Sequence, residues 1–92
     1  MPVTDAQIEE AVRIAREYGA TRVVLFGSAM DCPEHARDLD LAVDGVEGWE
    51  FFRLGARIDR ALGLPVDLVP LDPSTPFSRH VERWGRTLFH VA

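Results

Sequence analysis

Two aspartates alternate with leucines in the run Arg37–Asp44, and this alternation constrains how the chain can fold. The side chains of a β-strand point to opposite faces with a period of two. Asp38 and Asp40 would therefore share one face of a sheet, and the intervening apolar residues would share the other. Taken alone, this pattern also fits an ordinary half-exposed strand of an antiparallel sheet.

A third carboxylate, Asp67, interrupts the apolar run from Pro65 to Leu71. Aspartate is disfavoured inside strands, so a carboxylate in this place needs a partner. If the two strands are neighbours, Asp38, Asp40 and Asp67 converge on one side of a small sheet. Clustered carboxylates repel one another unless a cation lies between them, and hard oxygen ligands suit Mg²⁺. The pattern favours a metal site.

The pair Gly27-Ser28 follows the apolar run Arg22–Phe26. Backbone N–H groups at the start of a helix form a phosphate site, and a glycine allows a ligand to approach closely. Metal-binding carboxylates that face a phosphate site indicate phosphoryl or nucleotidyl transfer.

Turn and cap signals divide the rest of the chain into short elements. Thr4 and Gln7 form a capping-box pattern, Pro33 ends any helix that begins at Ser28, and Thr75-Pro76 begins a late helix. The expected helices span residues 5–18, 28–32, 49–62 and 76–84, and the expected strands span 22–26, 37–44, 65–71 and 87–91. This order predicts a single α+β domain over residues 1–92, with a small mixed sheet backed by helices.

The charge and the amino-acid composition of the chain argue against some classes of function. The formal net charge of −5 argues against tight nucleic-acid binding. No apolar run approaches the roughly 20 residues of a membrane span, and no secretory leader is present, so we expect a cytoplasmic protein without membrane contact. All ten basic residues are arginines, so any basic phosphate contact must come from arginine. Cys32 is the only cysteine and is expected to be a free loop thiol.

Two other groups of residues are weaker candidates for a site. The histidines show no metal-ligand spacing and are expected on the surface or in packing contacts: His35, His80 and His90. Four aromatic residues could stack on bases, but their helical placement favours core packing, with an exposed interface anchor as the alternative for one of them: Trp49, Phe51, Phe52 and Trp84.

The ordered set Gly-Ser, Asp-x-Asp and a distant Asp resembles the nucleotidyltransferase superfamily with a DNA polymerase beta-like fold. The chain length and the closing Trp84-Gly85-Arg86 segment narrow the resemblance to the minimal nucleotidyltransferases, or MNT proteins. The resemblance implies that Asp38 and Asp40 bind Mg²⁺ or Mn²⁺, with Asp67 as third ligand or base. It also implies that Gly27 and Ser28 bind the phosphates of a nucleoside triphosphate, with ATP the expected donor of AMP to a hydroxyl group.

The chain departs from the family pattern at two places. Ala29-Met30-Asp31-Cys32 stands where Ala-Arg-Gly is common, and Arg37 stands where serine is common. Arg37 or Arg22 could replace the missing phosphate contact.

The resemblance further implies a HEPN-type toxin partner that this protein neutralises as an antitoxin, and a chain this short would rely on a partner to present the acceptor. A non-catalytic module that neutralises its partner by binding alone is the alternative. The sequence leaves both homo- and hetero-oligomers open.

Overall fold

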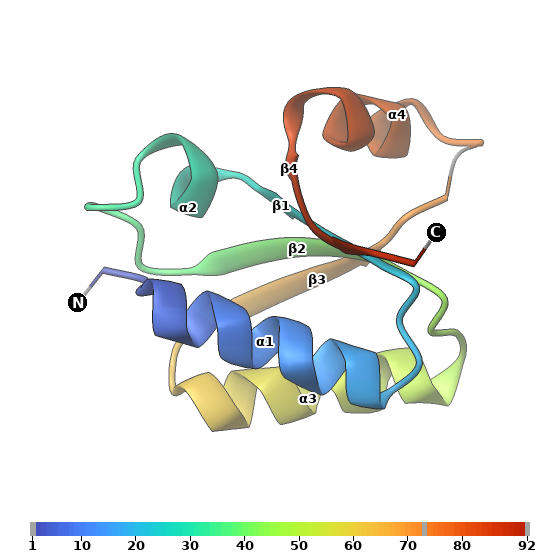
Figure 1. Ribbon diagram of the computed structural model, residues 1–92, viewed down its shortest axis with the longest axis horizontal. Helices are drawn as coiled ribbons and strands as arrows, with labels where there is room; N and C mark the ends of the chain where they lie inside the picture. Colours follow the sequence, from blue (N-terminus) through green and yellow to red (C-terminus); the bar gives the residue numbers. More distant parts are fainter. Residues whose placement is uncertain (1, 73, 92) are drawn as a thin grey trace.

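The computed structural model describes residues 2–72 and 74–91 and shows a four-stranded mixed sheet with helices on both faces (Figure 1). The strands lie in the order β3-β2-β1-β4. The elements are α1 (Asp5–Glu17), β1 (Arg22–Phe26), α2 (Ser28–Asp31), β2 (Leu39–Asp44), α3 (Trp49–Leu62), β3 (Val66–Pro70), α4 (Pro76–Trp84) and β4 (Arg86–His90).

The direction of two neighbouring strands follows from the helix that connects them. The helix α3 joins β2 to β3, and these two strands are parallel, as a helical crossover requires. The central strand β1 is antiparallel to both β2 and β4. The fold is therefore the mixed α+β sheet that the sequence predicts.

The core has two layers because β1 and β2 are buried on both faces. On one face, α1 and α3 pack Ile14, Leu54 and Ile58 against the sheet, where Leu41 is fully buried. On the other face, α4 covers a smaller cluster of Val24, Ala42, Leu71 and Val81. No helix in the described part of the chain is long and apolar enough to cross a membrane.

Three helices begin or end at the capping and proline signals predicted from the sequence. Thr4 and Gln7 form the capping box of α1, and the Thr75 hydroxyl accepts a hydrogen bond from the Ser78 backbone N–H at the start of α4. The short helix α2 ends at Asp31, two residues before Pro33.

The predicted bounds of three strands are wrong by one or two residues. The strand β2 begins at Leu39 and not at Arg37, since the first hydrogen bond to the neighbouring chain segment runs from the Leu39 N–H to the Pro65 carbonyl. The strand β3 loses one residue at each end, and β4 lies one residue earlier than expected.

The expected core packing of the aromatic set is also wrong for three of its four members. Trp49 is 82% exposed, Phe52 70% and Trp84 61%. The buried stripe of α3 runs through Leu54 and Ile58, and positions 49 and 52 lie off that stripe. Phe51 alone is half-buried against the core.

Candidate functional site

Asp40 and Asp67 are direct partners across the parallel pair β2–β3. The leucines of β2 that flank Asp40, Leu39 and Leu41, are buried against α1 and α3. Asp40 therefore points to the opposite face of the sheet, the face that α4 partly covers. Cross-strand partners on neighbouring strands share a face, so Asp67 lies on that side as well.

Asp38 lies just before β2, at the same end of the sheet. Its Oδ1 atom accepts a hydrogen bond of 3.3 Å from the Ser28 hydroxyl, which belongs to the first turn of α2. This contact joins the Gly-Ser segment to the aspartates across ten residues of sequence. Both Asp38 and Ser28 are exposed to solvent.

Gly27 brings the backbone of the β1–α2 turn against Asp40. Its φ angle of +76° lies in the left-handed region that favours glycine. A Cβ atom at this position would lie 3.0 Å from Asp40 Cγ and still closer to the Asp40 carboxylate oxygen Oδ2. Position 27 therefore requires glycine for two reasons: its φ angle is positive, and a side chain there would overlap Asp40.

Asp38 and Asp67 lie close enough to Asp40 for their negative charges to act on its carboxylate. Partial burial raises the pKa of Asp40 above its ordinary value, and the negative charges of Asp38 and Asp67 raise it further. A divalent cation would relieve this repulsion, and carboxylate oxygens are the donors that Mg²⁺ prefers. The side chains are not yet gathered into a ligand shell, because the described residues contain no group of three or more His, Cys, Asp or Glu side chains that could hold a metal ion. The donor chemistry fits a divalent metal, and the three carboxylates would have to draw together around it.

The two arginines expected to replace the missing phosphate contact do not lie at the site. Arg22 stands at the far end of β1, opposite Asp44, and its Nη1 atom forms a 2.6 Å ion pair with Glu82 Oε1. Arg37 lines a groove with Thr4 and Gln7 at the start of α1.

A cleft of about 310 Å³ adjoins Gly27, and sequence analysis missed it. It lies between α2 and α4 and includes Phe77 and Trp84, which are seven residues apart on α4. That spacing puts two aromatic residues on one face of a helix. The sequence contains this signal, but the same spacing is equally typical of core packing.

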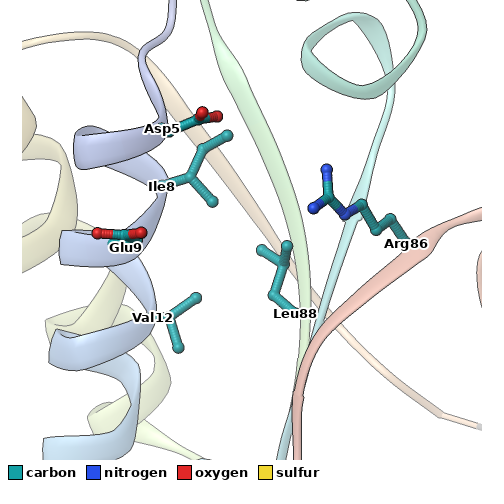
Figure 2. Close-up of a pocket in the computed structure, with 6 residues that line it drawn as sticks. All are labelled: Asp5, Ile8, Glu9, Val12, Arg86 and Leu88. Carbon is teal, nitrogen blue, oxygen red and sulfur yellow. The ribbon is translucent and has the colours of Figure 1, made fainter.

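A second groove, of about 380 Å³, lies between α1 and the edge strand β4 (Figure 2). It is lined by Asp5, Ile8, Glu9, Val12, Arg86 and Leu88, and it contains none of the predicted site residues. It is formed by α1, which packs on the sheet face opposite to Asp40.

No family model matches the sequence, and no curated protein matches it. Solved structures of low sequence identity do match. A chain of the MntA–HepT toxin–antitoxin complex superposes with a TM-score of 0.72 at 21% identity, over 96% of this chain and 74% of that one. A toxin–antitoxin structure with AMP-PNP gives a TM-score of 0.74 at 24% identity, over 97% and 75%.

A third structure, the complex of a tri-AMPylated Shewanella oneidensis HEPN toxin with its MNT antitoxin, gives a TM-score of 0.71 at 22% identity. That match covers 94% of this chain and 71% of the other. The chain has the MNT fold. The resemblance drawn from Gly27-Ser28, Asp38, Asp40 and Asp67 is thereby confirmed for the fold.

Proposed function

We propose that this protein is a divalent-metal-dependent nucleotidyltransferase that transfers AMP from ATP to a hydroxyl group of a HEPN-type protein and acts as its antitoxin. The observation that carries the proposal is the placement of Asp40 beside Asp67 on parallel strands, with the Gly27 backbone packed against Asp40. An acidic face next to an accessible glycine backbone is the arrangement that nucleotidyl transfer needs, with metal ligands on one side and a phosphate-binding turn on the other.

Each predicted site residue has a role in this proposal. Asp38, Asp40 and Asp67 would hold Mg²⁺ or Mn²⁺, which when bound supplies positive charge for the attacking and leaving oxygens. The backbone N–H groups around Gly27 and the Ser28 hydroxyl would bind the β- and γ-phosphates. Asp67 is exposed and would accept the proton of the acceptor hydroxyl as its oxygen bonds to the α-phosphorus and pyrophosphate leaves.

The solved structures of similar fold support the nature of the donor and the partner. One contains AMP-PNP, an analogue of ATP, and another contains an AMPylated HEPN toxin bound to an MNT antitoxin. A partner that presents its own hydroxyl group at the Asp40 face would supply the positioning on which such a reaction depends.

Transfer of label is the direct test. We expect that the protein, incubated with Mg²⁺, ATP labelled in its α-phosphate and a HEPN-type partner protein, transfers label to that partner. Asp67→Asn should stop the transfer, while Glu34→Gln, an exposed loop substitution, should not. An unlabelled partner in the presence of wild-type protein, ATP and metal would contradict the proposed activity.

Binding without catalysis is the second candidate function. It is favoured by the segment Ala29-Met30-Asp31-Cys32 of α2 and its C-cap, which lacks an arginine, and by the absence of a ready three-ligand cluster among the described residues. The two functions separate in the double variant Asp38→Asn/Asp40→Asn. Equal neutralisation of the partner by this variant and by wild type would favour binding alone.

A further inference from the structure

The cleft between α2 and α4 is a recess of about 310 Å³ on the side of the sheet away from α1 and α3 (Figure 1). Phe26 lines it from the end of β1, Met30 from α2, and Phe77 and Trp84 from α4. Its volume is at the lower limit of small-molecule sites, and the anchor residues of protein interfaces fill pockets of this apolar kind. The size and the lining of the cleft favour a bulky apolar side chain of another protein.

Two aromatic side chains of α4 remain largely uncovered beside the cleft. Trp84 is 61% exposed and Phe77 is 49% exposed, although Val81 between them is buried against the sheet. Phe77 meets Phe26 edge-on at a ring-centroid distance of 5.6 Å, and the Arg83 guanidinium lies 5.3 Å from the Trp84 ring. Aromatic residues and arginine are the types enriched at the energetically dominant positions of protein interfaces. The exposed surface of α4 therefore has the composition of an interface.

The two sides of the cleft carry charges of opposite sign. The exposed ionisable residues of α4 are all basic: Arg79, His80 and Arg83. Glu82, the one carboxylate of α4, is half-buried and forms the 2.6 Å ion pair with Arg22. On the side of α2, the carboxylate of Asp31 lines the cleft. Because the whole chain has a formal net charge of −5, the outer face of α4 is a basic surface on an acidic protein.

We propose that α4 and this cleft form the docking surface for a helix of the protein partner. That helix carries one bulky apolar anchor, carboxylates on its flank toward α4, and a lysine or arginine on its flank toward Asp31. The anchor enters between Trp84 and Met30, and the charges on the two flanks fix the direction of the helix, because the reversed orientation brings like charges together. The inference rests on the proposed function, which supplies the HEPN-type partner.

The charge pattern favours a protein helix over a nucleic acid. Aromatic and arginine side chains together also bind single-stranded nucleic acids. A phosphate backbone, however, would be repelled by Asp31 and by Asp40, which contacts Gly27 at the edge of the cleft. A helix can present opposite charges on its two flanks, and a phosphate backbone cannot.

Docking at this cleft holds the partner at a distance from the reacting atoms. Gly27 lines the cleft, and its backbone belongs to the turn proposed to bind the β- and γ-phosphates. In an in-line displacement the attacking oxygen approaches from the side opposite to the leaving pyrophosphate. The acceptor hydroxyl therefore belongs to another part of the partner, and the cleft supplies affinity for the partner.

Binding measured in EDTA separates docking from catalysis. With the HEPN-type partner of the label-transfer experiment, we expect Trp84→Ala and Phe77→Ala each to weaken binding roughly 5- to 30-fold in calorimetry. Trp49→Ala is the matched control, because Trp49 is exposed on α3 at the opposite face of the sheet, and it should leave the affinity unchanged. In label transfer, Trp84→Ala should raise the partner concentration that gives half of the maximal rate.

Charge reversal tests the basic side of the surface without removing an aromatic ring. Arg79→Glu/Arg83→Glu should weaken partner binding about 10-fold at low salt, and the loss should shrink at high salt because exposed charges are screened. Arg53→Glu/Arg57→Glu is the matched control. It changes the net charge equally, at the same spacing of four residues, on the exposed side of α3, and it should have little effect.

The outcomes separate this inference from the proposed function. Unchanged partner affinity in Trp84→Ala, Phe77→Ala and Arg79→Glu/Arg83→Glu would overturn the docking surface, while label transfer by the wild-type protein would still support the proposed function. Equal losses in Trp49→Ala and Trp84→Ala would also overturn it. Tight binding that depends on Trp84, without label transfer by the wild-type protein, would contradict the proposed activity and leave the docking surface in place.

Two further measurements test other occupants of the surface. Binding of a single-stranded RNA oligonucleotide that Arg79→Glu/Arg83→Glu abolishes, with partner affinity unchanged, would make the surface a nucleic-acid site and overturn the proposal. Dimerisation of the protein alone that Trp84→Ala abolishes, again with partner affinity unchanged, would assign the surface to a second copy of the chain. Light scattering during size-exclusion chromatography measures the second case.

Discussion

Gly27 and Asp40 lie so close together that the structure leaves no space for a side chain at position 27. Gly27 follows β1 and Asp40 lies in β2, thirteen residues further along the chain, yet a Cβ at Gly27 would overlap the Asp40 carboxylate. The proposed phosphate-binding turn and a proposed metal ligand are therefore in direct contact. A substitution at Gly27 should therefore disturb Asp40, and a substitution at Asp40 should change the cost of a side chain at position 27.

Gly27→Ala should destabilise the protein by about 2–4 kcal/mol, because it adds a steric clash to the cost of a positive φ angle. Gly48→Ala is the matched control. Gly48 has φ +61° and ψ −139°, close to the φ +76° and ψ −155° of Gly27, but no atom lies within 4 Å of the Cβ it would gain, so only the backbone cost of about 1–3 kcal/mol should be lost there. Chemical denaturation of both variants measures the difference. Equal losses would contradict the contact, and in an Asp40→Ala background the extra cost of Gly27→Ala should disappear.

Asp40 should make the stability of the metal-free protein depend on pH. Its pKa is raised in the folded state, so the folded protein binds this proton more tightly than the unfolded chain does. The resulting stabilisation is complete below the pKa of the unfolded chain and is lost as the pH rises through the higher folded pKa. Asp40→Asn should therefore raise the melting temperature at pH 7 in the presence of EDTA, by roughly 2–4 °C.

The same substitution should give no gain at a pH below the ordinary range of aspartate, where Asp40 is protonated in both states. Glu34→Gln, in the exposed loop after α2, is the control and should give no such pH-dependent gain. A lower melting temperature for Asp40→Asn at pH 7 would show that ionised Asp40 stabilises the metal-free fold, contrary to this prediction.

Divalent metal and ATP together should raise the melting temperature of the wild-type protein. A ligand present at 100 times its Kd adds about 2.7 kcal/mol, which corresponds to roughly 10 °C or more for a domain of this size. Asp38→Asn, Asp40→Asn and Asp67→Asn should each remove most of this shift in a thermal-shift assay with Mn²⁺ or Mg²⁺. A full shift in all three variants would place the metal elsewhere.

The sequence predicts the elements of this fold well because their signals are local. Thr4 with Gln7 and Thr75 with Ser78 begin helices through hydrogen bonds that span three residues, and Pro33 limits α2 in a similarly local way. The parallel direction of β2 and β3 follows from the helix α3 between them, whereas the pairing of Asp40 with Asp67 was expected only on the condition that the two strands are neighbours, and the structure shows that they are.

The sequence could not predict the contacts between segments that are distant along the chain. Arg22 and Glu82 are sixty residues apart, and only the packing of α4 on the sheet brings them together. The cleft at Gly27 likewise depends on the distance between α2 and α4. On α3, the helical spacing correctly predicts the buried stripe through Leu54 and Ile58, but Trp49 and Phe52 lie off that stripe and are exposed.

The exposed aromatics of α3 lead to a prediction about stability. Trp49→Ala and Phe52→Ala should each change the free energy of unfolding by less than about 1 kcal/mol, since both rings are largely exposed. They lie 6.0 Å apart between centroids, and Phe52 also meets the half-buried Phe51 edge-on at 6.4 Å. Leu54→Ala on the same helix should cost about 2–5 kcal/mol, because Leu54 is fully buried and its removal leaves a cavity.

Urea denaturation of the three variants separates the two faces of α3. The comparison is sensitive because tryptophan is larger than leucine, so burial alone would make Trp49→Ala the costlier change. A small loss for Trp49→Ala beside a large loss for Leu54→Ala therefore requires that Trp49 lies outside the core. A loss above 2 kcal/mol for Trp49→Ala would mean that its ring packs against the sheet, and the buried stripe of α3 would then have to include position 49.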